Sequence, residues 1–595
     1  MDASTTLSEL LSQAADQLAA TKPLLPTYSH LLISALFPIY AGAHASLTRP
    51  SSAAQPKKKD TDDEQEDEDD EEEEEGGLLG KMEGLEPSDA LMFPLMAGLT
   101  LGGLYLLIKW LQDPAILNKI LSWYFMQAGI TFAISFLKDV MVVIRSMVFP
   151  SRYSAGGLVY KVNQEERSFV AVNKVSSDQP SRRNSPLPGI FGRISLPDRM
   201  LKALWGVRGA VYRKAILHAY IHKVMDVKTR FGALNIVSCI ISLIVVSYFT
   251  FIEKTWYLTN FLGFSFAYSS LQFLTPTTFW TGSLLLSSLF FYDIYFVFFT
   301  PLMVTVATKL DIPVKLLFPR PSGPEEDPDI MSLAMLGLGD VVIPGMMIGL
   351  ALRFDIFLHY YRKQKSVEGG KSVVKPQYRN ATGGWGERFW TTRTPSSSFP
   401  EEEVSYREAK SFTKTYFYAG VIGYTIGMIA TLLVMQFFQH AQPALLYLVP
   451  GVLISLWGTA FFKGDIKPMW GFYDATDDEE EDEKGEEKDK KDKKEEDKST
   501  WQMLRDYFMG SKDSESSKEK DTEDEKKKDK EAPDGKDASK SKKDGDDNSK
   551  EQKPRADEDD KDLKLLSFNV TLPKKKKQQV QEKASVPETA TEKSS

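Results

Sequence analysis

Cysteine is nearly absent from this chain of 595 residues, which contains only Cys239. One thiol excludes an intrachain disulfide framework, because a disulfide needs two. Cys239 lies in an apolar stretch with no histidine near it in the sequence, so we interpret it as a small apolar residue of the interior rather than a nucleophile. Neither a disulfide scaffold nor cysteine-based catalysis is therefore expected.

Histidine is also scarce, and its six positions form no metal-binding motif. No His-Glu-x-x-His sequence occurs. His218 and His222 have the spacing of one helix face, but they lack an intervening glutamate and a third ligand. The Gly-x-Ser-x-Gly sequence of serine hydrolases is absent too. Zinc-dependent and serine-dependent hydrolysis are therefore poorly supported, and no metal site is expected.

Charge is segregated along the chain, so the net charge of −9 says little about partners. The mean hydropathy of −0.27 averages long apolar stretches with stretches that are almost wholly charged. Residues 50–75 and about 474–595 are poor in apolar residues and rich in Lys, Glu and Asp, so we predict that they are disordered. The run Lys574–Lys577 is interpreted as part of a solvated tail, and no nucleic-acid partner is expected.

Apolar stretches long enough to cross a bilayer recur along the rest of the chain. A spanning helix needs about 20 predominantly apolar residues. We therefore predict an all-α polytopic membrane protein with about nine transmembrane helices, at 28–47, 90–110, 117–143, 232–251, 256–274, 279–310, 330–354, 413–439 and 443–462. The first stretch follows a polar segment without a basic region, so we interpret it as an uncleaved span rather than a signal peptide.

Basic residues set the predicted orientation. They gather before the fourth span, at 202–230, and after the seventh, at 353–371. Loops rich in Lys and Arg stay in the cytosol, and both loops fall on one side of a nine-span protein. The N-terminus is therefore predicted to be lumenal, and the acidic loop and C-terminal tail cytosolic. The sequons at Asn380 and Asn569 would then be out of reach of glycosylation.

Two aspartates lie inside apolar stretches, where an isolated charge is costly. Asp293 follows Phe-Phe-Tyr and precedes Ile-Tyr-Phe, and Asp340 follows Leu-Gly-Leu-Gly. Two carboxyls that share one proton avoid part of this cost, and together they provide the base that activates a water and the acid that polarises a peptide carbonyl. Their titration belongs to the pair, so the sequence does not say which is acid and which is base. The alternative is an ion or proton path through a transporter.

The neighbours of the two aspartates suit a site that receives a peptide. Gly337 and Gly339 bracket Leu338 just before Asp340, and glycine lets another backbone approach closely. An extended segment here could receive an unwound substrate by strand addition. Tyr292, beside Asp293, could pack or hydrogen-bond near the pair. The alternative for the glycines is a helix-packing surface.

Three motifs in separate predicted spans resemble the signatures of the GxGD intramembrane aspartyl proteases. They are Phe291-Tyr-Asp293, Leu336-Gly-Leu-Gly-Asp340 and Gln442-Pro-Ala-Leu445. The extended forms are most similar to the signal peptide peptidase family; they are Met303-Val-Thr-Val-Ala307, Pro313-Val-Lys-Leu-Leu-Phe-Pro319, Gly339-Asp-Val-Val-Ile-Pro344, Leu352-Arg-Phe-Asp355 and Gln442-Pro-Ala-Leu-Leu-Tyr-Leu-Val-Pro450. The resemblance is most convincing over 279–462 and does not include the acidic loop or the tail.

The resemblance implies roles for particular residues. Asp293 and Asp340 would be the catalytic pair. Tyr292, Gly337, Leu338, Gly339, Pro443, Ala444 and Leu445 would surround the substrate. No metal or organic cofactor is implied. The segments would be a lumenal N-terminal segment (1–27), a first span (28–49), an acidic disordered cytosolic loop (50–86), N-terminal membrane helices with a basic loop (87–278), a catalytic membrane core (279–463) and a disordered charged cytosolic tail (464–595).

The resemblance also implies a setting and partners. The protein would be an endoplasmic-reticulum membrane enzyme that cleaves remnant signal peptides and type II-oriented membrane segments, with transmembrane peptides and lipids as its partners. Contacts with the degradation machinery of the endoplasmic reticulum through the cytosolic segments, and homo-oligomers, are compatible with the sequence. The alternative function is a non-proteolytic component that binds clients within a degradation complex.

Overall fold

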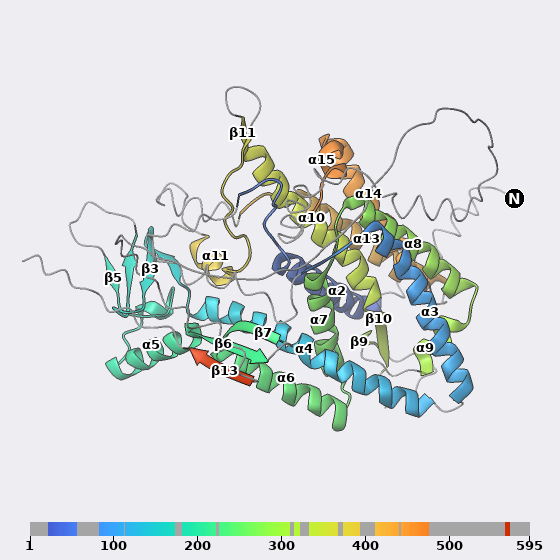
Figure 1. Ribbon diagram of the computed structural model, residues 1–595, viewed down its shortest axis with the longest axis horizontal. Coiled ribbons are helices and arrows are strands. Elements are labelled where there is room, and N and C mark those ends of the chain that lie inside the picture. Colours follow the sequence, from blue (N-terminus) through green and yellow to red (C-terminus); the bar gives the residue numbers. More distant parts are fainter. Residues whose placement is uncertain are drawn as a thin grey trace, which may run out of the picture. The chain divides into compact units, whose positions relative to one another are not determined.

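The computed structural model in Figure 1 describes residues 22–55, 82–111, 114–172, 181–221, 225–309, 315–321, 332–366, 373–392, 411–438, 442–474 and 566–571. Most of the two segments predicted to be disordered, and the run Lys574–Lys577, lie outside these residues. The chain separates into a large unit of 1–220, 226–477 and 568–595 and a small unit of 221–225 and 478–567. Almost all described residues belong to the large unit, whose architecture follows.

The described chain is mostly helical, as predicted. Its α-helices are α2 (Leu25–Ala45), α3 (Pro87–Leu111), α4 (Pro114–Val148), α5 (Asp198–Tyr212), α6 (Ala233–Phe251), α7 (Trp256–Phe273), α8 (Phe279–Phe298), α9 (Leu302–Lys309), α10 (Gly339–Lys363), α11 (Trp385–Thr391), α13 (Thr415–Phe438), α14 (Leu445–Lys463) and α15 (Ile466–Trp470). Short 3-10 turns lie at η1 (Lys22–Leu24) and η3 (Phe191–Arg193).

Within the described ranges, seven helices are long and apolar enough to cross a membrane: α3, α4, α6, α8, α10, α13 and α14. They confirm a multi-pass membrane protein but not the count of nine. Helices α2 and α7 coincide with two further predicted spans and do not reach the same hydropathy. Helix α7 is diluted by polar residues such as Thr259, Asn260 and Ser265, which are buried within the protein.

Two predicted spans have different boundaries in the structure. The helix predicted over 279–310 is interrupted: α8 ends at Phe298 and a new helix starts after Pro301. Proline interrupts a helix because it lacks a backbone N–H and its ring clashes with the carbonyl group four residues earlier. The span predicted over 330–354 begins later, because its first part is strand β10 (Leu333–Gly337). Two closely spaced glycines, Gly337 and Gly339, disfavour helix there.

Small β-sheets accompany the helices, which the all-α prediction did not include. Between α4 and α6 the strands β2 (Arg152–Ala155), β3 (Leu158–Asn163), β4 (Ser168–Ala171) and β5 (Arg182–Arg183) form an antiparallel sheet in the order β2-β3-β4-β5. Its core contains Tyr153, Tyr160 and Phe169 together with Trp205 of α5. Aromatic side chains that pack on a pleated surface explain why this segment folds as a sheet.

The remaining strands form two-stranded and three-stranded sheets. Strand β1 (Glu83–Leu85) pairs parallel with β8 (Leu274–Pro276), and β9 (Lys315–Pro319) pairs antiparallel with β10, with Gly337 opposite Lys315. Strand β11 (Lys365–Ser366) pairs with β12 (Val373–Val374). Strands β6 (Lys214–Ile221), β7 (Met225–Gly232) and β13 (Leu566–Thr571) form a sheet in the order β13-β6-β7.

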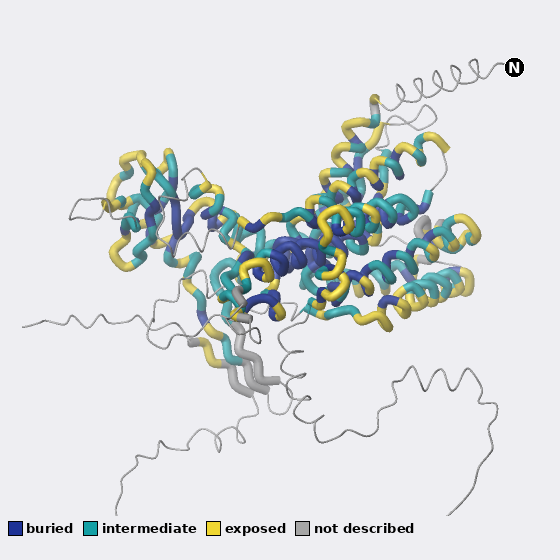
Figure 2. The backbone as a smooth tube through the Cα atoms, turned by 90° about the horizontal axis from the view of Figure 1, so that it is seen from above, coloured by how far each residue is buried: buried dark blue, intermediate teal, exposed yellow. Residues whose placement is uncertain are grey.

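Helix α10 is the central helix of the bundle. It packs against α2, α7, α8, α13 and α14. In its most apolar stretch 89% of the residues are buried, whereas no more than 33% are buried in the other six spanning helices. Figure 2 shows buried residues, in dark blue, gathered where helices lie side by side. The position of α10 therefore fixes the position of its neighbours.

Glycines allow α13 and α14 to pack backbone against backbone. A Cβ atom on Gly451 of α14 would lie 2.5 Å from the carbonyl oxygen of Gly423 on α13, and a Cβ on Gly427 would lie 2.7 Å from the carbonyl oxygen of Tyr447. Such contacts are too short for any side chain. This is the close approach that small residues permit between membrane helices.

The folded core extends beyond residue 463, where the disordered tail was predicted to begin. Helix α15 follows, and Phe472 is 3% exposed, with its ring 5.4 Å from that of Phe354 of α10. The carboxylate of Asp474 lies 2.5 Å from the guanidinium of Arg353, which is 2% exposed. Arg353 also donates to the hydroxyls of Ser46, at 2.9 Å, and Thr275. The first residues of the predicted tail therefore neutralise a buried charge on α10.

We expect Gly451→Ala to destabilise the protein, because its methyl group has no space between α13 and α14. Overpacking of this kind typically costs about 1–3 kcal/mol. Gly458→Ala on the same helix is the matched control, because a Cβ there meets nothing within 4 Å and should gain up to about 1 kcal/mol from helix propensity. Thermal melting of the purified protein in detergent measures both. Equal melting temperatures for the two variants would contradict this packing.

We expect Asp474→Asn to destabilise the protein strongly, because it leaves the charge of Arg353 buried without a carboxylate. Breaking a buried ion pair costs on the order of 3–5 kcal/mol. Truncation after Tyr473 should have the same defect, whereas truncation after Asp474 should not. The control is Glu166→Gln, which breaks the exposed pair Arg182–Glu166 and should cost less than about 1 kcal/mol. Melting temperatures that rank the two substitutions equally would refute the importance of Asp474.

Candidate active site

Asp293 lies in the last third of α8, the first of the two apolar helices that carry an aspartate. Its side chain is 6% exposed. Its Oδ2 atom accepts a hydrogen bond from the backbone N–H of Leu445 at 3.3 Å. Leu445 is the first residue of α14. The first amides of a helix have no partner within the helix, so this carboxylate satisfies one of them.

Asp340 is the second residue of α10. Its side chain is half-buried, and it is close enough to Asp293 for the two carboxyls to interact electrostatically. The structure therefore brings together two residues that are 47 positions apart in the sequence. The N-terminus of a helix carries partial positive charge, and each carboxyl faces one: Asp340 that of its own α10, and Asp293 that of α14.

Residues 337–339 connect strand β10 to α10. Gly337 and Gly339 are exposed, and neither has a positive φ angle. A Cβ on Gly337 would lie 3.5 Å from Oδ2 of Asp340, so a larger side chain there would cover the carboxylate. Glycine at this position keeps Asp340 accessible.

Leu338 behaves differently from the two glycines that flank it. Its side chain is 4% exposed and belongs to the main hydrophobic core, where it faces Gly263 of α7. Its carbonyl oxygen accepts the first hydrogen bonds of α10, from Val341 and Val342. The structure therefore places this predicted substrate contact in the interior, where it anchors the start of α10.

Tyr292 is half-buried on a different side of α8 from Asp293. Its ring centroid lies 4.5 Å from that of Phe296, and the ring also lies beside Gly98 of α3. The tyrosine therefore packs where α3 meets α8. Helices α3 and α8 are among the neighbouring pairs of the bundle, so Tyr292 connects the aspartate-bearing helix to the N-terminal helices.

The segment Pro443-Ala444-Leu445 forms the start of α14. Pro443 and Leu445 are buried, and Ala444 packs against the main core. The carbonyl oxygens of Pro443 and Ala444 accept hydrogen bonds from the first turn of the helix. The segment thus contacts Asp293 through the backbone amide of Leu445, and the packed side chains of the segment hold this amide in place.

Two further buried polar residues join α10 to α13, and only the first of them lies beside the site. Tyr424 of α13 is fully buried, and its hydroxyl donates to the backbone carbonyl of Asp340 at 3.3 Å. Asp355 of α10 is 4% exposed and accepts from the backbone amides of Tyr416, at 3.1 Å, and Phe417, at 2.9 Å. In the sequence, Asp355 was identified only as the last residue of the motif Leu352-Arg-Phe-Asp355, with no structural role. It caps the N-terminus of α13 and so fixes the register of that helix against α10.

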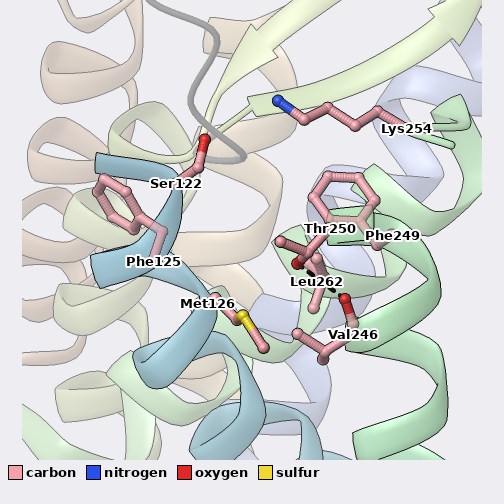
Figure 3. A pocket seen from close by; sticks show the side chains of 8 residues that line it. All are labelled: Ser122, Phe125, Met126, Val246, Phe249, Thr250, Lys254 and Leu262. Carbon is pink, nitrogen blue, oxygen red and sulfur yellow. Dashed lines mark hydrogen bonds between the residues drawn. The ribbon is translucent and has the colours of Figure 1, made fainter. Parts of the chain in front are cut away.

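The cavity in Figure 3 is separate from the two aspartates. It is lined by residues of α4, α6 and α7 and of the connection between α6 and α7, namely Ser122, Phe125, Met126, Val246, Phe249, Thr250, Lys254 and Leu262. Its volume of about 20 Å³ is enough for one water molecule, far too small for a peptide. Among the described residues no group of three or more His, Cys, Asp and Glu side chains could hold a metal ion.

Known proteins resemble this chain along most of its length. The sequence profile of the signal peptide peptidase family matches residues 79–476. Human signal peptide peptidase is 27% identical over 450 residues, which are 75% of this chain and 83% of the human protein. A probable intramembrane protease of Schizosaccharomyces pombe is 35% identical over 252 residues, which are 42% of this chain and 68% of that protein. Intramembrane protease 2 of Caenorhabditis elegans is 34% identical over 231 residues, which are 38% of this chain and 41% of the worm protein.

The matched region contains all seven apolar helices and both aspartates of the site. The resemblance inferred from the three motifs is thereby confirmed. The chain therefore belongs to the signal peptide peptidase family, a family of multi-pass intramembrane proteases.

Proposed function

We propose that the protein is an aspartyl endopeptidase in which Asp293 and Asp340 act together on one water molecule. The observation that carries this proposal is the approach of two carboxyls from separate apolar helices, α8 and α10. One carboxylate accepts a proton from the attacking water. The protonated partner donates to the oxygen of the scissile carbonyl. A single shared negative charge then suffices for the pair in its resting state.

The helix starts around the pair reduce the cost of that negative charge. The amide of Leu445 donates to Asp293, and Asp340 lies in the first turn of α10. Partial positive charge at both helix starts favours an anion in this apolar setting. In this proposal Pro443, Ala444 and Leu445 hold the donor amide, so that Asp293 keeps one orientation towards the water.

Strand β10 supports a route for presenting the substrate. Among the described strands its partner is β9, on one edge, and Met335 in the strand is 61% exposed. A helical substrate that unwinds can add an extended segment to such a sheet. The strand leads directly through Gly337 and Gly339 to Asp340. A peptide bound there would present its carbonyl groups next to the carboxyl pair.

The names of the relatives support a substrate class for this proposal. We propose that the substrates are remnant signal peptides and type II-oriented transmembrane segments, because relatives over most of this chain are named signal peptide peptidase. The corresponding site of action is the endoplasmic-reticulum membrane, with a lumenal N-terminus and a cytosolic C-terminus. Glycosylation of native Asn380 would contradict this orientation. Interactions with degradation machinery and formation of homo-oligomers belong to the same proposal.

We expect Asp293→Asn and Asp340→Asn each to abolish cleavage, because an amide can neither accept nor supply the catalytic proton. The loss should be on the order of 100- to 10,000-fold. The assay is cleavage of a labelled signal-peptide substrate by purified protein in detergent, with and without a transition-state analogue of aspartyl proteases. Asp89→Asn, which changes an exposed aspartate at the start of α3, is the control.

Wild-type product from either variant, in protein that melts normally, would end the two-aspartate proposal. The same variants separate it from a client-binding role in a degradation complex. If the inactive protein fully rescues a deletion strain, binding rather than cleavage is the function that the cell requires.

We expect Tyr424→Phe to lower kcat and leave KM unchanged, because the lost hydroxyl holds the backbone of Asp340 and does not contact substrate. A hydrogen bond worth about 1 kcal/mol corresponds to about a fivefold loss. Tyr418→Phe is the matched control, since this tyrosine of the same helix is 51% exposed. A rise in KM without a change in kcat would show that Tyr424 acts on substrate binding instead.

A further inference from the structure

Helix α5 has two apolar faces, and only one of them is covered. The inner face carries Leu201 and Trp205, which pack against the four-stranded sheet. The outer face carries Met200, Ala203, Val207 and Ala210, all exposed. Their spacing of i, i+3, i+7 and i+10 places them on one stripe of a helix. None of the hydrophobic clusters among the described residues includes this second stripe.

The segment before α5 continues this exposed apolar surface. Ile190 is 79% exposed, Phe191 63% and Ile194 53%, compared with 52% for Met200 and 50% for Val207. These five large side chains fall within 18 residues and outside all seven apolar spanning helices. Apolar surface concentrated in this way marks an interaction site. We call the exposed side chains of residues 190–210 the α5 outer surface.

Basic side chains are interleaved with the apolar ones. Arg193, Arg199 and Lys202 are all exposed on the α5 outer surface, and Asp198 is its one acidic residue. An apolar stripe bordered by Lys and Arg is typical of helices that lie in the interface of an anionic membrane. A protein partner would have to match both the apolar stripe and the positive charge.

The last residue of α5 connects this surface to a membrane helix. The hydroxyl of Tyr212 donates to the carbonyl of Phe149 at 2.7 Å, one residue after α4 ends. The guanidinium of Arg145 in the last turns of α4 lies 4.1 Å from the centre of the Tyr212 ring. Helix α5 also contacts α6. Its C-terminal end is thus held where two spanning helices meet the aqueous phase, and a helix of this length extends only about 22 Å from there.

We propose that the α5 outer surface docks on the membrane leaflet at which α4 ends. Ile190, Phe191, Ile194, Met200 and Val207 insert into the boundary between headgroups and acyl chains. Arg193, Arg199 and Lys202 contact the headgroups of anionic lipids. Docking holds the four-stranded sheet against the membrane surface. This inference does not depend on the aspartyl mechanism.

The test is a depth measurement on the full-length protein in lipid bilayers. Cys239→Ser removes the only cysteine, and Val207→Cys then carries a single nitroxide label. Collision with oxygen reports contact with the acyl region, and collision with a water-soluble nickel chelate reports contact with water. The bilayers are phosphatidylcholine alone or phosphatidylcholine with phosphatidylserine. The control label is at Glu165→Cys. The preceding residue, Gln164, hydrogen-bonds to Trp205 and Arg208 on the inner side of α5, so Glu165 lies on the side away from the α5 outer surface.

We expect the Val207 label to be accessible to oxygen and shielded from the chelate in bilayers with phosphatidylserine, while the Glu165 label stays accessible to the chelate in both. Each basic residue near an anionic surface is worth about fivefold in partitioning. Reversing the charges with Arg193→Glu, Arg199→Glu and Lys202→Glu should therefore lower membrane contact of the Val207 label by more than about tenfold, and high salt should act in the same direction.

Two results would overturn the proposal. A Val207 label that is as accessible to the chelate as the Glu165 label in bilayers with phosphatidylserine would show that the surface faces water. A label shielded from both reagents and strongly immobilised would show that protein, either a partner or a second copy, covers the surface instead. The melting temperature of each labelled protein shows that the substitutions leave the fold intact.

Discussion

The central constraint of this structure is that its most buried helix carries charge. Helix α10 contains Asp340, Arg353 and Asp355, and its surroundings are apolar. Each of the three groups is stabilised in a different way. Asp340 lies at the helix start, Arg353 pairs with Asp474, and Asp355 accepts two amides from the start of α13. Without these partners, a charge at Arg353 or Asp355 would be buried and very costly, because both side chains are almost fully shielded from solvent. The places of α13 and of the segment after α14 are therefore consequences of the charges on α10.

The geometry around Asp293 depends on the same helix through a series of contacts. Asp355 fixes the start of α13 against α10, and α13 packs through Gly423 and Gly427 against α14. The first amide of α14 then reaches Asp293. The carboxyl of α8 is thus positioned relative to Asp340 by contacts that extend through two other helices. Close glycine packing limits movement along this series, because at Gly423 and Gly427 the backbone of α13 lies against the backbone of α14.

The part of the chain between α4 and α6 has its own hydrophobic core, apart from the helical bundle. Its sheet buries Tyr153, Phe169 and Trp205 in a core of its own, yet it leaves an apolar stripe of α5 uncovered. Near a membrane, such a stripe does not require a protein partner, since the lipid interface can cover it. The protein would then use the bilayer twice, as the solvent of its spanning helices and as the surface on which this sheet rests.

The sequence alone determined the class of the protein and its motifs. Long apolar stretches can only be satisfied in a bilayer as helices, and Asp293 and Asp340 within them were anomalous whatever the fold. Local residue preferences were less decisive. The glycines around Leu338 indicated an extended segment, which is strand β10, but the break before α9 at Pro301 was not predicted.

Only the tertiary structure decided which residues surround the aspartates and in what role. Leu338 is adjacent to two exposed glycines in sequence and yet faces the core, because the chain bends there from β10 into α10 and its side chain packs on Gly263 of α7. Tyr424 and Asp355 act through backbone groups of distant residues, which no local pattern reveals. Asp474 lies at the edge of a charged segment that looks disordered, and its partner Arg353 is 121 positions earlier. Contacts between groups so far apart in sequence depend on how the helices pack, and the packing cannot be read from amino-acid composition.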